Sequence, residues 1–294
     1  MKTVIEIGIP AHNEEANIAH VLASIKDQSQ DNFQIRQIVI NSDGSTDATV
    51  SRALATGIKN LKVHDNPQRK GKPTRVGELL EDATADILVL LDADVRLAST
   101  QSLWELISPI VLHNAALVSG RPQKVMTSSS FDRIMDVSMH LQDYVKSRVN
   151  GGANVYACHG RILALHRKLY SSLVPFESWT GDDAYIYFYN QQLGGRFSYA
   201  KDAVVLFKMP QNPSDFFRQQ SRFQDGRSQL AKRFGEKILT EYKVPVRVYL
   251  GAVFTAFARW PYPFLRYVAL RLKGRRGYQP SLKAWVPSST TKQL

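Results

Sequence analysis

The stretch "DILVLLDADVRLAS", residues 86–99, is an apolar run that ends abruptly in two carboxylates. Residues 87–91 are all Ile, Leu or Val, which is typical of a strand buried on both faces of a parallel sheet. Asp92 and Asp94 follow at once, and in extended backbone they point to the same side. Two like charges so close together favour a hard divalent cation, Mg²⁺ or Mn²⁺, between them. A solvated loop with capping acids is the alternative for this spacing alone.

The first hundred residues alternate between strand and helix patterns. Strands are expected at residues 3–9, 35–40, 61–64 and 86–91, and helices around residues 18–25 and 73–83. Such alternation predicts an α/β fold with a mostly parallel, Rossmann-like sheet and helices on both faces. Asn13 is expected to cap the first helix, and Ser45 or Thr46 the helix that follows the second strand. Beyond residue 100 the pattern is less regular, with a helix capped by Thr180, a strand at 197–207 and a long basic helix from residue 213.

Polar side chains gather where these strands end. His12 and Glu14 follow the first strand, Asp43 follows the second, and Asp92 and Asp94 follow the fourth. Ligands bind outside the carboxyl ends of the strands in open parallel sheets. Three clusters on one edge therefore predict a binding site there.

The net charge of +12 is unevenly distributed along the 294 residues. Residues 208–294 hold 17 Lys and Arg against 4 Asp and Glu, whereas the rest of the chain is nearly neutral. A basic segment of this kind suits nucleic acid, anionic lipid or a phosphorylated substrate. A single cysteine, Cys158, excludes an internal disulfide and fits a reducing compartment. No signal peptide or membrane-spanning run is recognisable, so we expect a cytoplasmic protein.

Four stretches, in this order and spacing, resemble the signature of family 2 glycosyltransferases: "IGIPAHNEEANI", "VINSDGSTDAT", "DILVLLDADVRL" and "TGDDAYIYF". The resemblance implies a GT-A (nucleotide-diphospho-sugar transferase) fold over residues 1–225. Residues 1–100 would be the nucleotide-binding half, residues 101–225 the acceptor half, and residues 226–294 a basic helical extension. It also implies a hexosyltransferase that moves a sugar from a nucleotide-diphosphate donor to a hydroxyl acceptor, a lipid or a growing glycan. The implied reaction is metal-dependent and inverts the anomeric configuration.

The resemblance also implies roles for individual residues on the donor side. Asp92 would contact the ribose or the sugar, and Asp94 would hold the metal, Mn²⁺ or Mg²⁺. Asp43 would accept a hydrogen bond from the base, which favours a uridine donor without excluding guanosine. The segment matching Pro10, Ala11, His12 and Glu14 would wall the nucleoside. Arg69, Lys70 and Lys72 are offered to the diphosphate, although a solvated charged loop is an equal alternative.

Proton chemistry is assigned to an acidic pair. A hydroxyl that attacks an anomeric carbon needs a base to remove its proton, and in the family that base is the aspartate of a Glu-Asp pair, which Asp183 matches. Asp182 stands in place of the usual glutamate. Without the resemblance, both acids would simply complement the positive end of a helix.

The stretch "QQSRF", residues 219–223, resembles the Gln-x-x-Arg-Trp motif of family members that make polysaccharides or glycolipids. Gln219 and Arg222 lie three apart on one helix face, so both can reach the leaving diphosphate or the acceptor. Phe223 replaces the usual Trp and keeps an apolar platform. The alternative is a basic amphipathic helix with no such role.

The segment 244–277 mixes bulky apolar residues with arginines, and its longest uncharged run is too short to span a bilayer. Aromatic rings beside arginines suit the headgroup region, so contact with an anionic membrane at the inner face of the cell membrane is one interpretation. A helical hairpin packed on the catalytic core is the other.

Two further function classes remain open for the whole protein. The first is a nucleotidyltransferase, which usually needs a glycine-rich loop that "GIPAHNEE" lacks. The second is a non-catalytic nucleic-acid-binding protein, which leaves the acidic edge unexplained.

Overall fold

The computed structural model describes residues 2–276 except 128, 130, 175 and 177–180, with the backbone alone at 220–225 and 274–276. The strands are β1 (Thr3–Ala11), β2 (Phe33–Asp43), β3 (Leu61–Asn66), β4 (Ile87–Leu91), β5 (Val95–Leu97), β6 (Leu117–Lys124), β7 (Ile162–His166) and β8 (Phe197–Phe207). The α-helices are α1 (Ile18–Lys26), α2 (Thr49–Ala55), α3 (Lys72–Asp82), α4 (Ser102–His113), α5 (Asp132–Arg148), α6 (Arg167–Ser172), α7 (Asp182–Gln192), α8 (Pro213–Phe234), α9 (Val246–Arg259) and α10 (Pro261–Arg276). Short 3₁₀ turns are η1 (Val149–Gly152), η2 (Val155–Ala157) and η3 (Glu236–Thr240).

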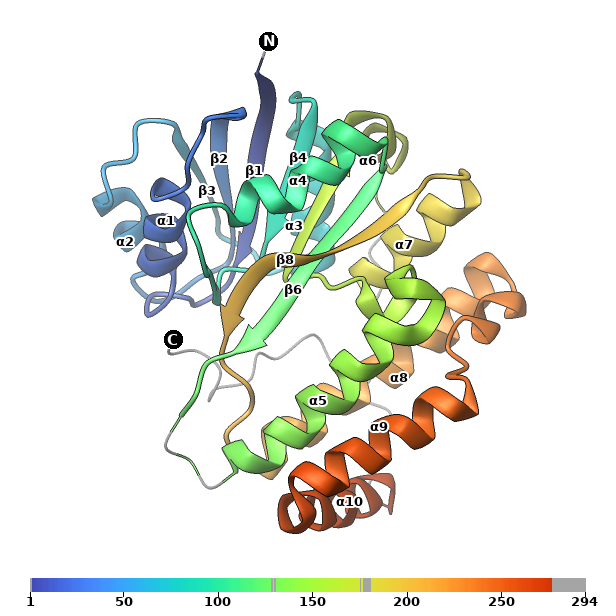
Figure 1. Cartoon of the computed structure of the whole chain (residues 1–294). Coiled ribbons are helices and arrows are strands. Elements are labelled where there is room, and N and C mark those ends of the chain that lie inside the picture. The colour runs from blue at the N-terminus through green and yellow to red at the C-terminus, as the bar shows by residue number, and fades with distance from the viewer. Residues whose placement is uncertain (1, 128, 130, 175, 177–180, 277–294) are drawn as a thin grey trace.

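The strands form one eight-stranded mixed sheet in the order β3-β2-β1-β4-β7-β6-β8-β5. Strands β1 to β4 pair in parallel, which brings their carboxyl ends to one edge, at the lower left of the sheet in Figure 1. Strand β7 runs antiparallel to both β4 and β6, and β5 runs antiparallel to β8. The expected α/β fold is confirmed. Strand β7 lies beyond residue 100, where the sequence pattern is irregular, whereas β5 follows Asp94 within the first hundred residues, where no strand was expected.

Helices cover both faces of the sheet because its strand residues alternate between two apolar clusters. The odd-numbered residues of β1 and β4, such as Ile7 and Val89, pack in one cluster with α1 and α4. Leu88 and Leu90 face the other way and pack with α3, α6 and α7. Gly8 allows the close approach of α3, since a Cβ there would lie 3.1 Å from the Leu79 side chain. All five residues of β4 are buried, as the sequence predicted.

Two predicted helix caps are wrong. Helix α1 begins at Ile18 with Asn17 at the cap position, while Asn13 lies four residues earlier with φ 52°. The Asn13 side chain accepts a hydrogen bond from the Thr46 amide instead, at 2.8 Å, and so joins the first two strand ends. Helix α2 likewise begins after Ala48, so Ser45 and Thr46 lie in the turn. The predicted Thr180 cap of α7 lies outside the described residues.

The C-terminal part is helical, as expected, and α9 and α10 form a hairpin against α5 below the sheet (Figure 1). The expected boundary at residue 225 falls within α8, which continues to Phe234. Across residues 2–276, no described helix combines the length and apolarity needed to cross a membrane.

Candidate active site

The carboxylates after β4 meet the start of α7 through one lysine. Lys72, the first residue of α3, places its Nζ 2.6 Å from Asp92 Oδ1 and 3.7 Å from Asp182 Oδ2. Burial alone would lower the pKa of Lys72, but the charges of Asp182 and Asp92 more than offset this, so its pKa lies above the ordinary value. The ammonium is therefore fixed as a cation between two acids that are 90 residues apart in sequence.

Asp183 faces the same centre from the first turn of α7. Its Oδ2 accepts a hydrogen bond from the Gly160 amide at 3.1 Å, and its Oδ1 accepts one from the Ala184 amide at 2.8 Å. Burial and the neighbouring charge of Asp182 raise the pKa of Asp183 to about 6, although Lys72 and the two amides act in the opposite direction. A carboxylate with this pKa is ionised at neutral pH and can still accept a proton readily, which is the property of a general base.

The segment before β7 holds these two parts together. The Asp92 amide donates to the Arg161 carbonyl at 3.1 Å, and the Gly160 amide binds Asp183. Residues 158–161 thus connect the end of β4 to the start of α7. Sequence reasoning missed this role because "ACHGR" carries no periodic or turn signal that points to it.

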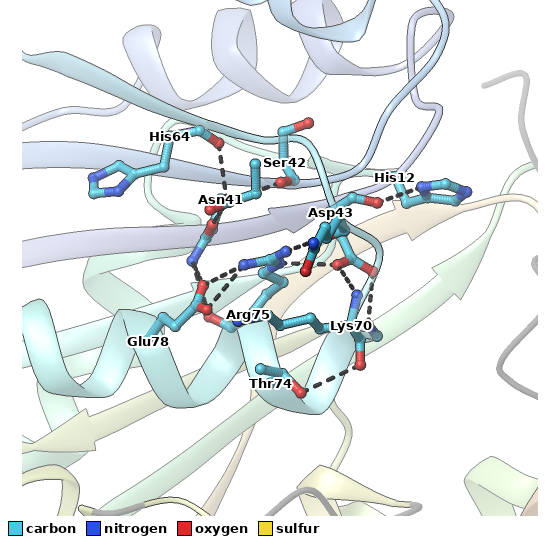
Figure 2. Close-up of polar contacts among 12 residues, drawn as sticks. His12, Asn41, Ser42, Asp43, His64, Lys70, Thr74, Arg75 and Glu78 are labelled. Carbon is cyan, nitrogen blue, oxygen red and sulfur yellow. Dashed lines mark hydrogen bonds and ion pairs between the residues drawn. The ribbon is translucent and has the colours of Figure 1, made fainter.

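Asp43 lies at the end of β2 inside a dense polar network (Figure 2). Its Oδ1 accepts hydrogen bonds from the Lys70 amide at 2.7 Å and from Arg75 Nε at 2.9 Å, and its Oδ2 accepts one from the Gly71 amide at 2.8 Å. Arg75, which is 1% exposed, extends from α3 between Asp43 and Glu78 and makes two further bonds to Glu78. Asp43 therefore fixes the loop that leads into Lys72, and its Oδ2 retains acceptor capacity for one more bond.

The other residues expected to contact the nucleoside lie at the end of β1. Pro10 and Ala11 are its last residues and pair in parallel with the end of β2. The His12 Nδ1 lies 2.7 Å from the Asp43 carbonyl, so its ring stands over the same strand end (Figure 2). Glu14 is 7% exposed, and its carboxylate accepts a hydrogen bond from Asn17 at 2.9 Å. Glu14 thus has a structural partner within the loop.

The residues expected at the diphosphate have different surroundings in the structure. Lys72 points to the carboxylates, whereas Lys70 contributes its backbone amide to Asp43 and has an exposed side chain. Gln219 is partly buried on α8. Arg222 and Phe223 belong to the same helix, but their side chains lie outside the described residues.

The donor set after β4 fits a hard divalent cation. Burial and the adjacent charge of Asp92 raise the pKa of Asp94, against the opposing effects of Arg161 and Lys72. A carboxylate in this position gains from a cation, and oxygen ligands are those that Mg²⁺ and Mn²⁺ prefer. Among the residues that the structure describes, no three His, Cys, Asp or Glu side chains gather as a complete metal site. Asp94 and Asp92 would therefore supply only part of the shell of such an ion, and a diphosphate and water would have to complete it.

Similarity to known proteins agrees with this geometry. Residues 6–173, more than half of the chain, match the family described as Glycosyl transferase family 2. Glucosyl-3-phosphoglycerate synthase of Mycobacterium tuberculosis (strain CDC 1551 / Oshkosh) is 32% identical over 95 residues, which are 31% of this chain and 29% of that protein. The matched stretch therefore spans less than a third of the curated relative.

Solved structures are similar over most of the fold. Mannosyltransferase PcManGT from Pyrobaculum calidifontis, in complex with GDP-Man and Mn²⁺, aligns with a TM-score of 0.60 and 18% identity over 95% of this chain and 77% of that one. Glucosyl-3-phosphoglycerate synthase from M. tuberculosis, in complex with Mn²⁺, UDP and phosphoglyceric acid, aligns with a TM-score of 0.56 and 19% identity, and covers 79% of each chain.

The fold and the site together define a glycosyltransferase of the GT-A class. An open sheet presents paired carboxylates after β4 and an acidic pair at the start of α7, and both solved structures share this fold. The chain belongs to glycosyl transferase family 2. The family, the fold and the enzyme class that the sequence implied are thereby confirmed.

Proposed function

We propose that the protein transfers a hexosyl group from a UDP-linked sugar to a hydroxyl acceptor with inversion at the anomeric carbon. The observation that carries this proposal is the position of Asp183. A partly buried carboxylate whose pKa is raised to about 6 lies next to Lys72, which itself binds Asp92 at the end of β4. Neither a nucleotidyltransferase nor a nucleic-acid-binding protein gains support from the family match.

The proposed reaction is a single displacement. The acceptor oxygen bonds to the anomeric carbon, the bond from that carbon to the diphosphate breaks, and the acceptor proton passes to Asp183. Mn²⁺ or Mg²⁺ on Asp94 would stabilise the negative charge of the leaving diphosphate when bound. Asp92 orients the ribose or the sugar, and Lys72 holds Asp92 and Asp182 in place. Asp182 and the Gly160 amide set the ionisation and the direction of Asp183.

Uridine is the proposed base, because Asp43 Oδ2 has capacity to accept one further hydrogen bond and uracil offers an imide N–H. His12, Pro10 and Ala11 stand around the same strand end and would pack on the nucleoside, with Glu14 supporting their loop. Gln219 and Arg222 of α8, with Phe223, are proposed for the diphosphate or the acceptor.

The test is turnover of a panel of UDP- and GDP-sugars with Mn²⁺ or Mg²⁺, with and without a lipid extract. The parent should consume one donor, and Asp94→Ala and Asp183→Asn should strongly lower this consumption, whereas Glu81→Gln, at an exposed acid on α3, should not. NMR of the product should show the opposite anomer from the donor. Absence of nucleotide-sugar binding under every condition would overturn the proposal, and turnover of GDP-sugars alone would overturn the choice of base.

The C-terminal hairpin is proposed to contact an anionic membrane surface. On α9 the small residues Gly251, Ala252 and Ala256 face inward, and Thr255 contacts His140 of α5 at 2.9 Å. Large apolar side chains point outward instead, and Phe254 is 73% exposed. The exposed apolar residues of the hairpin are Val246, Tyr249, Leu250, Phe254, Phe257, Tyr262, Leu265, Val268 and Leu272.

The positive charge of the hairpin favours an anionic membrane as the partner of its exposed apolar surface. The sequence from residue 242 to residue 276 contains arginines and lysines but no Asp or Glu. Apolar and aromatic side chains bordered by cations suit the interface of an anionic bilayer. The protein should sediment with phosphatidylglycerol vesicles but not with phosphatidylcholine vesicles, and Phe254→Ser with Phe257→Ser should weaken binding at least tenfold. Leu112→Ser, on the exposed side of α4, is the control. If the protein does not sediment with phosphatidylglycerol vesicles, or if the apolar surface of the hairpin is buried in a dimer, the proposed membrane contact is wrong.

A further inference from the structure

Four basic side chains converge beside the proposed catalytic carboxylates, and the reaction as described so far uses none of them. We call them the basic cluster: Arg121 of β6, Lys146 of α5, and His159 and Arg161 from the segment before β7. The four residues span 40 positions of the sequence, so only the tertiary fold can bring them together.

Backbone contacts place the cluster. The His159 amide donates to Ser119 Oγ at 3.0 Å, so this segment lies against the face of β6 that carries Ser119. Arg121 is two residues further along β6, just after an irregularity in the pairing with β8, and both Arg121 and Asp143, the acid beside Lys146, act on the charge of Tyr199. The amide of Gly160, which lies between His159 and Arg161, donates a hydrogen bond to Asp183 Oδ2 at 3.1 Å. His159 and Arg161 therefore flank the amide that contacts the proposed base.

Three polar atoms of the cluster have no partner within the described part of the protein. Arg121 Nε, His159 Nε2 and Arg161 Nε are shielded from solvent, and none has a hydrogen-bond partner among the described residues. Buried polar atoms of this kind usually have a partner, so an unpaired group suggests a ligand. The three side chains are partly exposed, so they also border open space. The Arg161 guanidinium stacks 3.9 Å from the centre of the Phe207 ring, which holds it in one orientation.

The charge balance of the cluster is positive. Lys146 is 3% exposed, and the acid that pairs with it, Asp143, is 3.4 Å away and 42% exposed. Burial, with a smaller contribution from Arg161, lowers the pKa of Lys146 to about 8 despite the attraction of Asp143. Burial, Lys146 and Arg161 together hold the pKa of His159 well below its ordinary value. Asp94 faces Arg161 from the end of β4. A bound anion would relieve the repulsion among these groups.

The cluster lies on the acceptor side of the site. Asp43, proposed for the donor base, is on β2, whereas the cluster lies over β7 and β6. Strands β1 and β4 separate β2 from β7 in the sheet order. A donor that contacts Asp43 and the carboxylates after β4 would therefore lie to one side of the cluster, with Arg161, which faces Asp94, at the border between the two substrates.

We propose that the acceptor carries a phosphate group, which Arg121, Lys146 and Arg161 bind so that the acceptor hydroxyl points to Asp183. This inference rests on the proposed function. Two guanidinium groups and an ammonium match the charge and the several oxygens of a phosphate better than those of a carboxylate, because each arginine can donate two parallel hydrogen bonds. The phosphate belongs either to a small soluble molecule or to a lipid headgroup.

The test measures binding without turnover. Glycerol 3-phosphate, glycerol and inorganic phosphate are titrated calorimetrically into the parent, with dodecyl phosphate in neutral detergent micelles as the lipid arm. Glycerol 3-phosphate or dodecyl phosphate should bind, inorganic phosphate should compete, and glycerol should not bind. Arg121→Gln and Arg161→Gln should each raise the Kd at least tenfold, whereas Arg133→Gln, on the exposed side of α5, should leave it unchanged. Circular dichroism confirms that each variant is folded.

UDP binding with Mn²⁺ is measured separately, so the two proposals can fail independently. Loss of UDP binding with retained phosphate binding would contradict the proposed function and keep the phosphate site. Saturating UDP should leave the Kd for the phosphate probe unchanged, and displacement of the probe by UDP would overturn the acceptor assignment. Failure of both phosphate probes to bind, or equal binding by the arginine variants, would overturn the inference. Binding of dodecyl phosphate alone would assign the phosphate to a lipid.

Discussion

Replacing Lys72 by methionine keeps the length of the side chain and removes its charge. The ammonium lies 2.6 Å from Asp92 and 3.7 Å from Asp182, and its charge favours the ionised form of Asp183. Without it, three carboxylates would lie close together with less compensation. The pKa of Asp183, about 6 in the parent, should therefore rise in Lys72→Met.

The size of this rise follows from the geometry. Lys72 Nζ and Asp183 Oδ2 lie 3.2 and 3.6 Å from the position that a Cβ on Gly160 would occupy, so the two charges are less than about 7 Å apart and interact directly. At an effective dielectric constant of about 20–80, this separation gives roughly 0.6–2.4 kcal/mol. That energy corresponds to about 0.4–1.7 pKa units, and we expect a shift of about one unit.

The assay is the pH dependence of kcat/KM for donor turnover between pH 4.5 and 8.5 at constant ionic strength. The acidic limb of this profile reports the base in the free enzyme. Its midpoint should lie near pH 6 in the parent and about one unit higher in Lys72→Met. Lys62→Met, an exposed lysine on β3, should match the parent. An unchanged midpoint in Lys72→Met, or a parent midpoint below pH 5, would refute the assignment of Asp183.

Three further predictions concern single side chains. Asp183→Asn should lower turnover at least about 100-fold, yet its melting temperature relative to the parent should rise between pH 4 and pH 7.5. The reason is that the pKa of Asp183 is raised from 3.8 to about 6, so the folded parent binds the extra proton in this window and loses stability as the pH increases through it; a relative melting temperature independent of pH would contradict this. Arg75→Met leaves Asp43 and Glu78 without their buried partner and should lower the free energy of unfolding by about 3–5 kcal/mol in urea denaturation, against less than about 0.5 kcal/mol for exposed Arg133→Met; equal effects would show that the network adds no stability. Asp94→Ala should remove the stimulation of donor turnover by Mn²⁺ and Mg²⁺, as tested by metal titration, and an unchanged metal dependence would mean that other residues hold the ion.

The local pattern of apolar and polar residues in the sequence predicted much of the fold. The apolar run before Asp92 predicted β4, whose five residues are all buried, and the strand and helix alternation predicted β1 to β3, α1 and α3. These signals are local, because burial periodicity and turn residues act within a few positions of the chain. The helix caps failed for the same reason. Asn13 has the chemistry of a cap, but its oxygen binds the Thr46 amide across the site, 33 residues away.

By itself, the sequence determined that acids stand at the carboxyl ends of parallel strands and that their spacing matches one glycosyltransferase family. Tertiary structure alone decided which charges meet. Lys72, expected at a diphosphate, binds Asp92 and Asp182 from two distant segments. Arg75, unremarkable within an amphipathic helix, is the buried partner of Asp43. The basic cluster arises in the same way from β6, α5 and the segment before β7. Such contacts depend on how separate elements cross, and a charge pair formed across the fold leaves no periodic signal in the chain.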